Sequence, residues 1–291
     1  MDVRILGGFS VAENGVSITP TAAAPRQLLA LLAAQADQVV PVTLLREELW
    51  PSGAPRGARV ELQSHIQDLR TLIAAALEGA EPTPAAAPGW PERHTAEAVL
   101  VSLPGGYRLD TGGGSNDARQ FERAAGAGYR AMEAGDLPRA VRRLSEALAL
   151  WRGTPYAGVA AGPRLRGEIE RLETSRLSVL DQWAEAQLAL GRHFEIIAEL
   201  AELVAQYRTN EPLHGQFMVA LLRCGRQDEA LEVYQRLCEG LKRRTGREPS
   251  ARLRRLQRSI LAIRDTARVA RPVFVPAPSA RPRLLPAGLS L

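Results

Sequence analysis

Residues 56–77 predict a single amphipathic helix whose polar face could recognise another molecule. Leu62, Ile66, Leu69 and Ile73 recur at intervals of three and four residues, so they form one buried stripe. The opposite face carries amide, hydroxyl and guanidinium groups, on Arg59, Gln63, Ser64, Gln67, Arg70 and Thr71. Amides and hydroxyls can reach base edges in the major groove of DNA, and arginines can bind guanine or phosphate. The same face would also suit a solvated helix of an ordinary small α+β domain.

The elements before this helix predict how it is held. Residues 1–20 read as short strands with a hairpin at Asn14-Gly15, because Asn-Gly between apolar residues is a strong hairpin signal. Residues 25–36 then predict a helix, and Thr43 can cap a second one. This order, with two helices before the polar-faced helix, is that of a helix-turn-helix domain.

The segment after the polar-faced helix predicts a loop and a wing. Residues 79–98 are rich in Pro and Ala and are expected to form a loop. Residues 99–109 form the expected wing hairpin, which completes a winged-helix domain over residues 1–110. Residues 111–116 are Gly-rich and predict a flexible linker.

The rest of the chain predicts a helical repeat. A shift of 34 residues aligns aromatic, small and turn residues in two copies, pairing Trp183 with Phe217, Ala186 with Ala220, Gly191 with Gly225 and Arg192 with Arg226. This period is typical of tetratricopeptide repeats, which stack into an all-α solenoid. A third, less regular copy surrounds Gly135, and the stretch from Trp151 to Gly162 is an insertion between copies. We expect the repeat to cover 117–266 and a disordered tail to cover 267–291. The predicted fold class is therefore mainly α, with an N-terminal α+β winged helix.

Charge and composition narrow the function. The net charge is +5, but residues 1–110 carry −4 and residues 241–291 carry +11, so the pI is no argument for DNA binding by the first domain. Cys224 and Cys238 are the only cysteines and predict no disulfide framework. Without a long apolar stretch or a signal-peptide pattern, we expect a cytoplasmic protein with no membrane partner. No catalytic set, metal-ligand spacing or phosphate loop is recognisable, so we expect neither an enzyme nor a cofactor or metal.

Motifs from both predicted domains resemble one family. The segments that carry the resemblance are RQLLALL (26–32), LW (49–50), ARVELQSHIQDLR (58–70), PGGYRL (104–109), GDLPRA (135–140), LSEALALWRGTP (144–155), GRQDEA (225–230) and GREPS (246–250). They are similar to the Streptomyces antibiotic regulatory proteins, or SARP family. The resemblance covers about residues 3–265 and implies an OmpR/PhoB-type winged helix followed by a bacterial transcriptional activation domain.

The resemblance implies a transcriptional activator of secondary-metabolite genes. Such a protein would bind direct repeats in promoter DNA as two protomers and recruit RNA polymerase through its sigma and alpha subunits. The implied DNA-binding residues are Arg26, Arg56, Arg59, Gln63, Ser64, His65, Gln67, Arg70, Gly106, Tyr107 and Arg108.

The polar-faced helix departs from the family pattern in its charge. The family has two or more basic residues around Gln67, Asp68 and Thr71, but here Arg70 is the basic one and Asp68 would repel phosphate. This leaves a second hypothesis, a repeat scaffold whose winged helix no longer binds DNA tightly.

Overall fold

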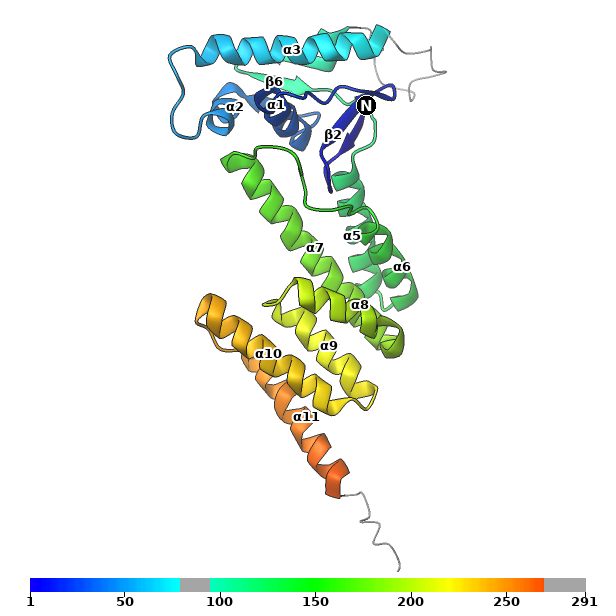
Figure 1. The fold of residues 1–291 in the computed structure, drawn as a ribbon. Helices are drawn as coiled ribbons and strands as arrows, with labels where there is room; N and C mark the ends of the chain where they lie inside the picture. The colour runs from blue at the N-terminus through cyan, green and yellow to red at the C-terminus, as the bar shows by residue number, and fades with distance from the viewer. Residues whose placement is uncertain (79–94, 270–291) are drawn as a thin grey trace, which may run out of the picture. The chain divides into compact units, whose positions relative to one another are not determined.

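The computed structural model describes residues 1–78 and 95–269 (Figure 1). The chain divides into two compact units, Met1–Ile196 and Ile197–Leu291, which are described separately below. Most elements are helices, and two small antiparallel sheets lie in the N-terminal part, so the expected fold class is confirmed. Of the expected loop and tail, residues 79–94 and 270–291 lie outside the described residues.

The N-terminal sheet is an antiparallel meander. Its strands are β1 (Asp2–Arg4), β2 (Ser10–Glu13) and β3 (Val16–Ser17). Asn14 and Gly15 join the last two strands with φ of 51° and 80°. Two positive φ values in succession are the type I′ geometry that favours Asn-Gly, and the predicted hairpin is confirmed.

Three helices form the core of the winged-helix domain. They are α1 (Ala23–Ala34), α2 (Val42–Leu49) and α3 (Ala58–Glu78). The predicted apolar stripe of α3 is buried along its length, with every member at most 3% exposed. The expected cap by Thr43 is wrong: α2 already begins at Val42, its N-cap residue is Pro41, and no side chain caps it.

The wing belongs to a three-stranded sheet. Its order is β4-β6-β5, with β4 (Val40–Pro41), β5 (Leu100–Leu103) and β6 (Gly106–Leu109). The predicted hairpin is confirmed, although a short helix, α4 (Ala96–Val99), precedes β5 where the end of the loop was expected. The pairing of β4 with β6 was not predicted, because two residues are too short to show a strand pattern.

The remaining helices form the repeat region. They are α5 (Asp117–Glu133), α6 (Leu137–Leu148), α7 (Pro163–Ala189), α8 (His193–Gln206), α9 (Glu211–Arg223), α10 (Gln227–Thr245) and α11 (Ala251–Val269). Gly135, Gly191 and Gly225 follow α5, α7 and α9, and all three have φ between 73° and 78°. In each turn, the glycine and the next residue donate to the same two carbonyl positions of the preceding helix. This Schellman geometry supports the three predicted repeat copies.

The expected flexible linker is held against the first strand. The Val3 N–H donates to the Ser115 carbonyl at 2.9 Å, and the Ile5 N–H donates to the Asp117 carboxylate at 2.8 Å. Gly114 passes so close to Met1 that a Cβ atom there would overlap the Met1 carbonyl. Long-range hydrogen bonds therefore join the end of the expected linker and the first residue of α5 to the N-terminal strand region.

The insertion between α6 and α7 packs on the winged-helix domain. Backbone hydrogen bonds of 2.7–3.1 Å join residues 5–9 to Arg152, Tyr156 and Ala157. The Tyr156 ring is buried and stacks on Phe9, with ring centroids 5.9 Å apart. The first helices of the repeat region and the winged helix therefore share one packed unit.

No helix among residues 1–78 and 95–269 combines the length and apolar character needed to cross a membrane.

Candidate nucleic-acid interface

The exposed face of α3 carries most of the predicted base-reading residues. Gln63, Ser64 and Gln67 are exposed, while the stripe beneath them is buried. Arg56 and Arg59 are also exposed and lie at the N-terminal end of this helix. Three neutral hydrogen-bonding side chains next to two guanidinium groups could contact base edges and phosphates together.

His65 lies on the same helix but is largely covered. Its side chain is 15% exposed, and its ring nitrogens lie 3.8 Å from a Glu61 oxygen and 3.9 Å from an Asp68 oxygen. Neither ring nitrogen has a hydrogen-bond partner within the described part of the chain. His65 is therefore the predicted reader least accessible on this face.

Arg70 connects α3 to the wing. Its Nη2 donates to the Leu100 carbonyl and to the Ser102 hydroxyl, each at 2.9 Å, and its Nε donates to the same carbonyl at 3.3 Å. These bonds fix β5 against α3. An Arg70 substitution would therefore disturb the wing as well as any DNA contact.

The predicted wing residues have different environments. Gly106 is buried under β4, where a Cβ atom would lie 2.6 Å from the Val40 carbonyl oxygen, so glycine is required for close strand packing. Tyr107 and Arg108 are half-buried, and an Arg108 nitrogen lies 3.7 Å from the Asp110 carboxylate. Of the three predicted wing residues, Tyr107 and Arg108 are thus those with surface open to a ligand.

Arg26 does not join the α3 face. Its Nε donates to the Pro20 carbonyl at 2.7 Å, and its Nη1 donates to the Gly158 carbonyl at 3.0 Å. These bonds attach α1 to the insertion between α6 and α7. Two of the three guanidinium nitrogens are therefore engaged in internal contacts, and the phosphate contact that the resemblance implies stays a prediction.

Sequence reasoning missed Glu48, which joins α2 to the repeat region. Its buried carboxylate accepts hydrogen bonds from the N–H groups of Gly162, Arg164 and Leu165, at 2.6, 2.8 and 3.3 Å. Gly162 has no side chain to cap α7, so Glu48 supplies the cap and a negative charge at the helix N-terminus. The sequence did contain a signal for this role. Glu48 lies three residues after Leu45, so its carboxylate falls on the apolar face of the short helix α2.

A second missed acid, Asp37, joins α1 to α5. Its carboxylate accepts from the Thr111 N–H at 2.8 Å and from Arg119 Nη1 at 2.7 Å. Burial alone would raise the pKa of Asp37, but the hydrogen bonds from Thr111 and Arg119 outweigh it and hold the pKa below the usual range of an aspartate.

We expect Asp37→Asn to change how stability depends on pH. A lowered folded-state pKa stabilises the fold above the unfolded value, and this contribution disappears as the pH falls through the folded pKa. At pH 7 the variant should lose about 1 kcal/mol of unfolding free energy, because the site is partly exposed. Urea unfolding should show this gap closing as the pH falls below the usual pKa range of an aspartate. A gap that does not narrow at acid pH would contradict the assignment.

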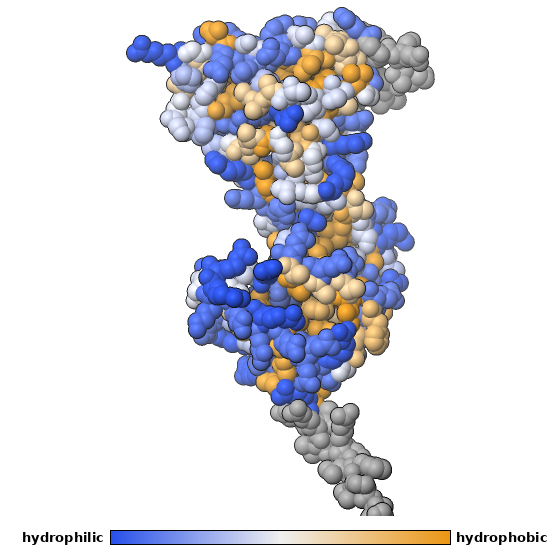
Figure 2. Space-filling view, in the orientation of Figure 1, coloured by the Kyte–Doolittle hydropathy of each residue, from blue (hydrophilic) through white to orange (hydrophobic). Residues whose placement is uncertain are grey.

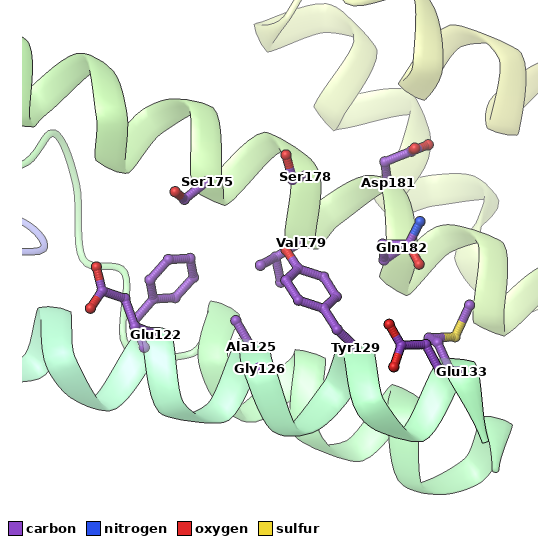
Figure 3. Close-up of a pocket in the computed structure, with 12 residues that line it drawn as sticks. Glu122, Ala125, Gly126, Tyr129, Glu133, Ser175, Ser178, Val179, Asp181 and Gln182 are labelled. Atoms are coloured by element: carbon purple, nitrogen blue, oxygen red, sulfur yellow. The ribbon is translucent and has the colours of Figure 1, made fainter. Parts of the chain in front are cut away.

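A groove of about 720 Å³ lies between α5 and α7 in the first unit (Figure 3). Figure 3 shows the Tyr129 ring of α5 projecting toward α7, with Val179 opposite. Apolar side chains, including Phe121 and Met132, share the lining with three acids, Glu133, Asp181 and Glu122, of which Glu122 is paired with Arg171 at 2.8 Å. An apolar surface bordered by acids suits a partner segment that presents apolar side chains beside basic ones.

Known proteins match both parts of this architecture. Residues 116–261 match the family described as bacterial transcriptional activator domain. The regulatory protein DnrI of Streptomyces peucetius is 42% identical over 90% of this chain and 92% of its own length. The transcriptional regulator RedD of Streptomyces coelicolor is 33% identical over 90% of this chain and 71% of its own length.

A solved structure matches the fold as well. It is EmbR of Mycobacterium tuberculosis in complex with a low-affinity phosphopeptide, at 29% identity and a TM-score of 0.76. The match covers 90% of this chain and 65% of EmbR. With its winged helix, its helical repeat and these matches, the chain belongs to the SARP family of transcriptional regulators.

Proposed function

We propose that this protein is a cytoplasmic, sequence-specific DNA-binding activator of secondary-metabolite biosynthesis genes. The observation that carries the proposal is the face of α3, where Gln63, Ser64 and Gln67 are exposed over a fully buried stripe. An amphipathic helix of this kind can place its polar face in the major groove while its apolar stripe packs in the core of the domain. Arg56 and Arg59, with Tyr107 and Arg108 of the wing, would position the helix on the phosphate backbone.

The arrangement on DNA follows from the family resemblance. Two protomers would occupy neighbouring direct repeats, and each would place one α3 in the major groove. RNA polymerase, through its sigma and alpha subunits, would be the second partner. Within the first unit, the groove between α5 and α7 is a suitable surface for it, because its apolar floor and acidic border complement a basic, apolar segment.

A gel-shift titration with Gln63→Ala/Gln67→Ala tests the proposal. Loss of two amide contacts should weaken specific binding at least about 30-fold, since each good base contact contributes about 1–3 kcal/mol. The salt dependence of binding should stay the same, because neutral side chains release no counterions. Duplexes from the regions upstream of the protein's own gene and its neighbours serve as probes, with a scrambled duplex for non-specific binding.

Gln206→Ala/Gln235→Ala is the matched control, because both glutamines are exposed on helices of the second unit. This variant should bind DNA as the unsubstituted protein does. Arg59→Ala should instead lower the salt slope by about one, as expected for a phosphate contact. Equal binding of specific and scrambled duplexes by the folded, unsubstituted protein would contradict the proposal.

One observation favours the second candidate, an interaction module that does not hold DNA tightly. Glu61 and Asp68 flank His65 on α3, and Arg70 is bonded to the wing. The face therefore offers fewer free cations than its sequence suggests, which would weaken phosphate neutralisation. Failure of the specific shift even at low salt would select this candidate.

A further inference from the structure

The second unit contains a groove of about 440 Å³ between α8, α9 and α10. The lining combines small or apolar side chains with cationic ones, and comprises Ala201, Val204, Ala205, Arg208, His214, Phe217, Val233, Arg236, Glu239, Gly240 and Arg243. Its volume lies within the range of sites that hold small organic ligands, about 300–1,000 Å³. The feature is separate from both the α3 face and the groove between α5 and α7.

The floor of this groove is apolar and firmly packed. Phe217 is 7% exposed and Val233 is 3% exposed, so both belong to the core of the unit and present only part of their surface. Ala201 and Ala205 are short and exposed on α8, which leaves the floor open. His214 is fixed in the wall, with Nδ1 2.8 Å from the Asn210 carbonyl oxygen.

The charged lining comprises three arginines, Arg208, Arg236 and Arg243, and one acid, Glu239, whose carboxylate lies 3.9 Å from Arg243. Arg208 and Arg236 are exposed, and their Nε atoms donate to the backbone carbonyls of Ala205 and Glu232, at 3.3 and 3.4 Å. Within the described part of the chain, neither guanidinium has a carboxylate within 4.0 Å. In Figure 2, hydrophilic side chains gather over the end of α10 that leads into α11.

His214 adds little positive charge to this lining. Burial lowers the pKa of its ring, and the nearby Arg236 lowers it further. At neutral pH the arginines therefore supply the positive charge. Guanidinium groups that lack acidic partners beside an apolar floor are complementary to an anion attached to an apolar body.

We propose that this groove binds a small amphipathic organic acid, with its carboxylate between Arg208 and Arg236 and its apolar part against Phe217 and Val233. The size of the groove favours a medium-chain or aromatic carboxylate over an extended protein segment, whose interface would be larger. The site is independent of DNA recognition, so its test does not depend on the proposed function.

Isothermal titration of the full chain with sodium decanoate tests this site. We expect saturable one-to-one binding of decanoate and none of decylammonium, which carries the same tail with the opposite charge. Arg208→Gln/Arg236→Gln should weaken binding at least tenfold, because it removes both charge-assisted contacts. Ala205→Phe should weaken it similarly by filling the floor from an exposed helix position, where a larger side chain leaves the core unchanged.

Arg139→Gln/Arg142→Gln is the matched control, since it removes the same charge from exposed positions of α6. It should bind decanoate as the unsubstituted protein does, and circular dichroism should show every variant folded. Equal binding of decylammonium, multi-site binding, or affinity unchanged in both groove variants would overturn the proposal. Binding of an acidic peptide without binding of decanoate would also overturn it, in favour of a peptide partner.

Discussion

Glu48→Ala is expected to lower the free energy of unfolding of the first unit by about 3 kcal/mol. The substitution leaves the N–H groups of Gly162, Arg164 and Leu165 without their acceptor in a buried site. It also removes the negative charge at the N-terminus of α7. Because the carboxylate belongs to α2 and its donors to the start of α7, the loss should fall on the contact between the winged helix and the repeat region.

Tryptophan fluorescence during urea unfolding reports on the first unit, because all four tryptophans lie before residue 197. Glu47→Ala is the matched control. Glu47 is adjacent and forms an exposed ion pair with Arg164 at 2.7 Å, and pairs of this kind contribute about 0–1 kcal/mol. A loss of similar size in the two variants would show that the cap on α7 is not what makes Glu48 important.

Tyr156→Ala should destabilise the same unit by about 4 kcal/mol, because truncating a buried aromatic ring leaves a cavity. The Tyr156 ring is 2% exposed and stacks on Phe9, so nothing nearby can fill the space without moving the β1–β2 loop. The insertion between α6 and α7 should then detach from the winged helix, and backbone amides of residues 5–9 should exchange faster with solvent.

Tyr156→Phe distinguishes the contribution of the ring to stability from that of the hydroxyl, because it removes the hydroxyl alone. The hydroxyl is buried, has no hydrogen-bond partner among the described residues, and burial raises its pKa. Removing an unsatisfied buried hydroxyl should leave stability unchanged or increase it by about 1 kcal/mol. A marked loss in Tyr156→Phe under the same urea titration would mean that the hydroxyl has a partner in solution, and the packing argument would fail.

Together, these contacts make the winged-helix part of the first unit dependent on the repeat region. Glu48 lies in the helix before α3, and Tyr156 supports the loop after β1. The acids Asp37 and Asp117 hold the same two regions together from the other side. A partner bound between α5 and α7 would therefore touch helices that are packed directly against the winged helix.

The sequence alone determined the features that depend on local periodicity. The stripe of α3, the Asn14-Gly15 turn and the wing hairpin follow from spacings of two to four residues. The repeat follows from glycines at fixed helix ends, where a left-handed turn requires them. These signals need no knowledge of distant residues, so they could be identified before the fold was known.

Only the tertiary structure decided which polar residues remain free for a ligand. Arg70 and Arg26 look equivalent to Arg59 in the sequence, yet the first is bonded to the wing and the second to Gly158. Glu48 caps a helix whose N-cap residue lies 114 residues later in the chain, and the Gly-rich linker is bonded to a strand at the N-terminus. The physical reason is the same in each case: the partner is a backbone group whose position exists only after folding, so no local pattern encodes the contact.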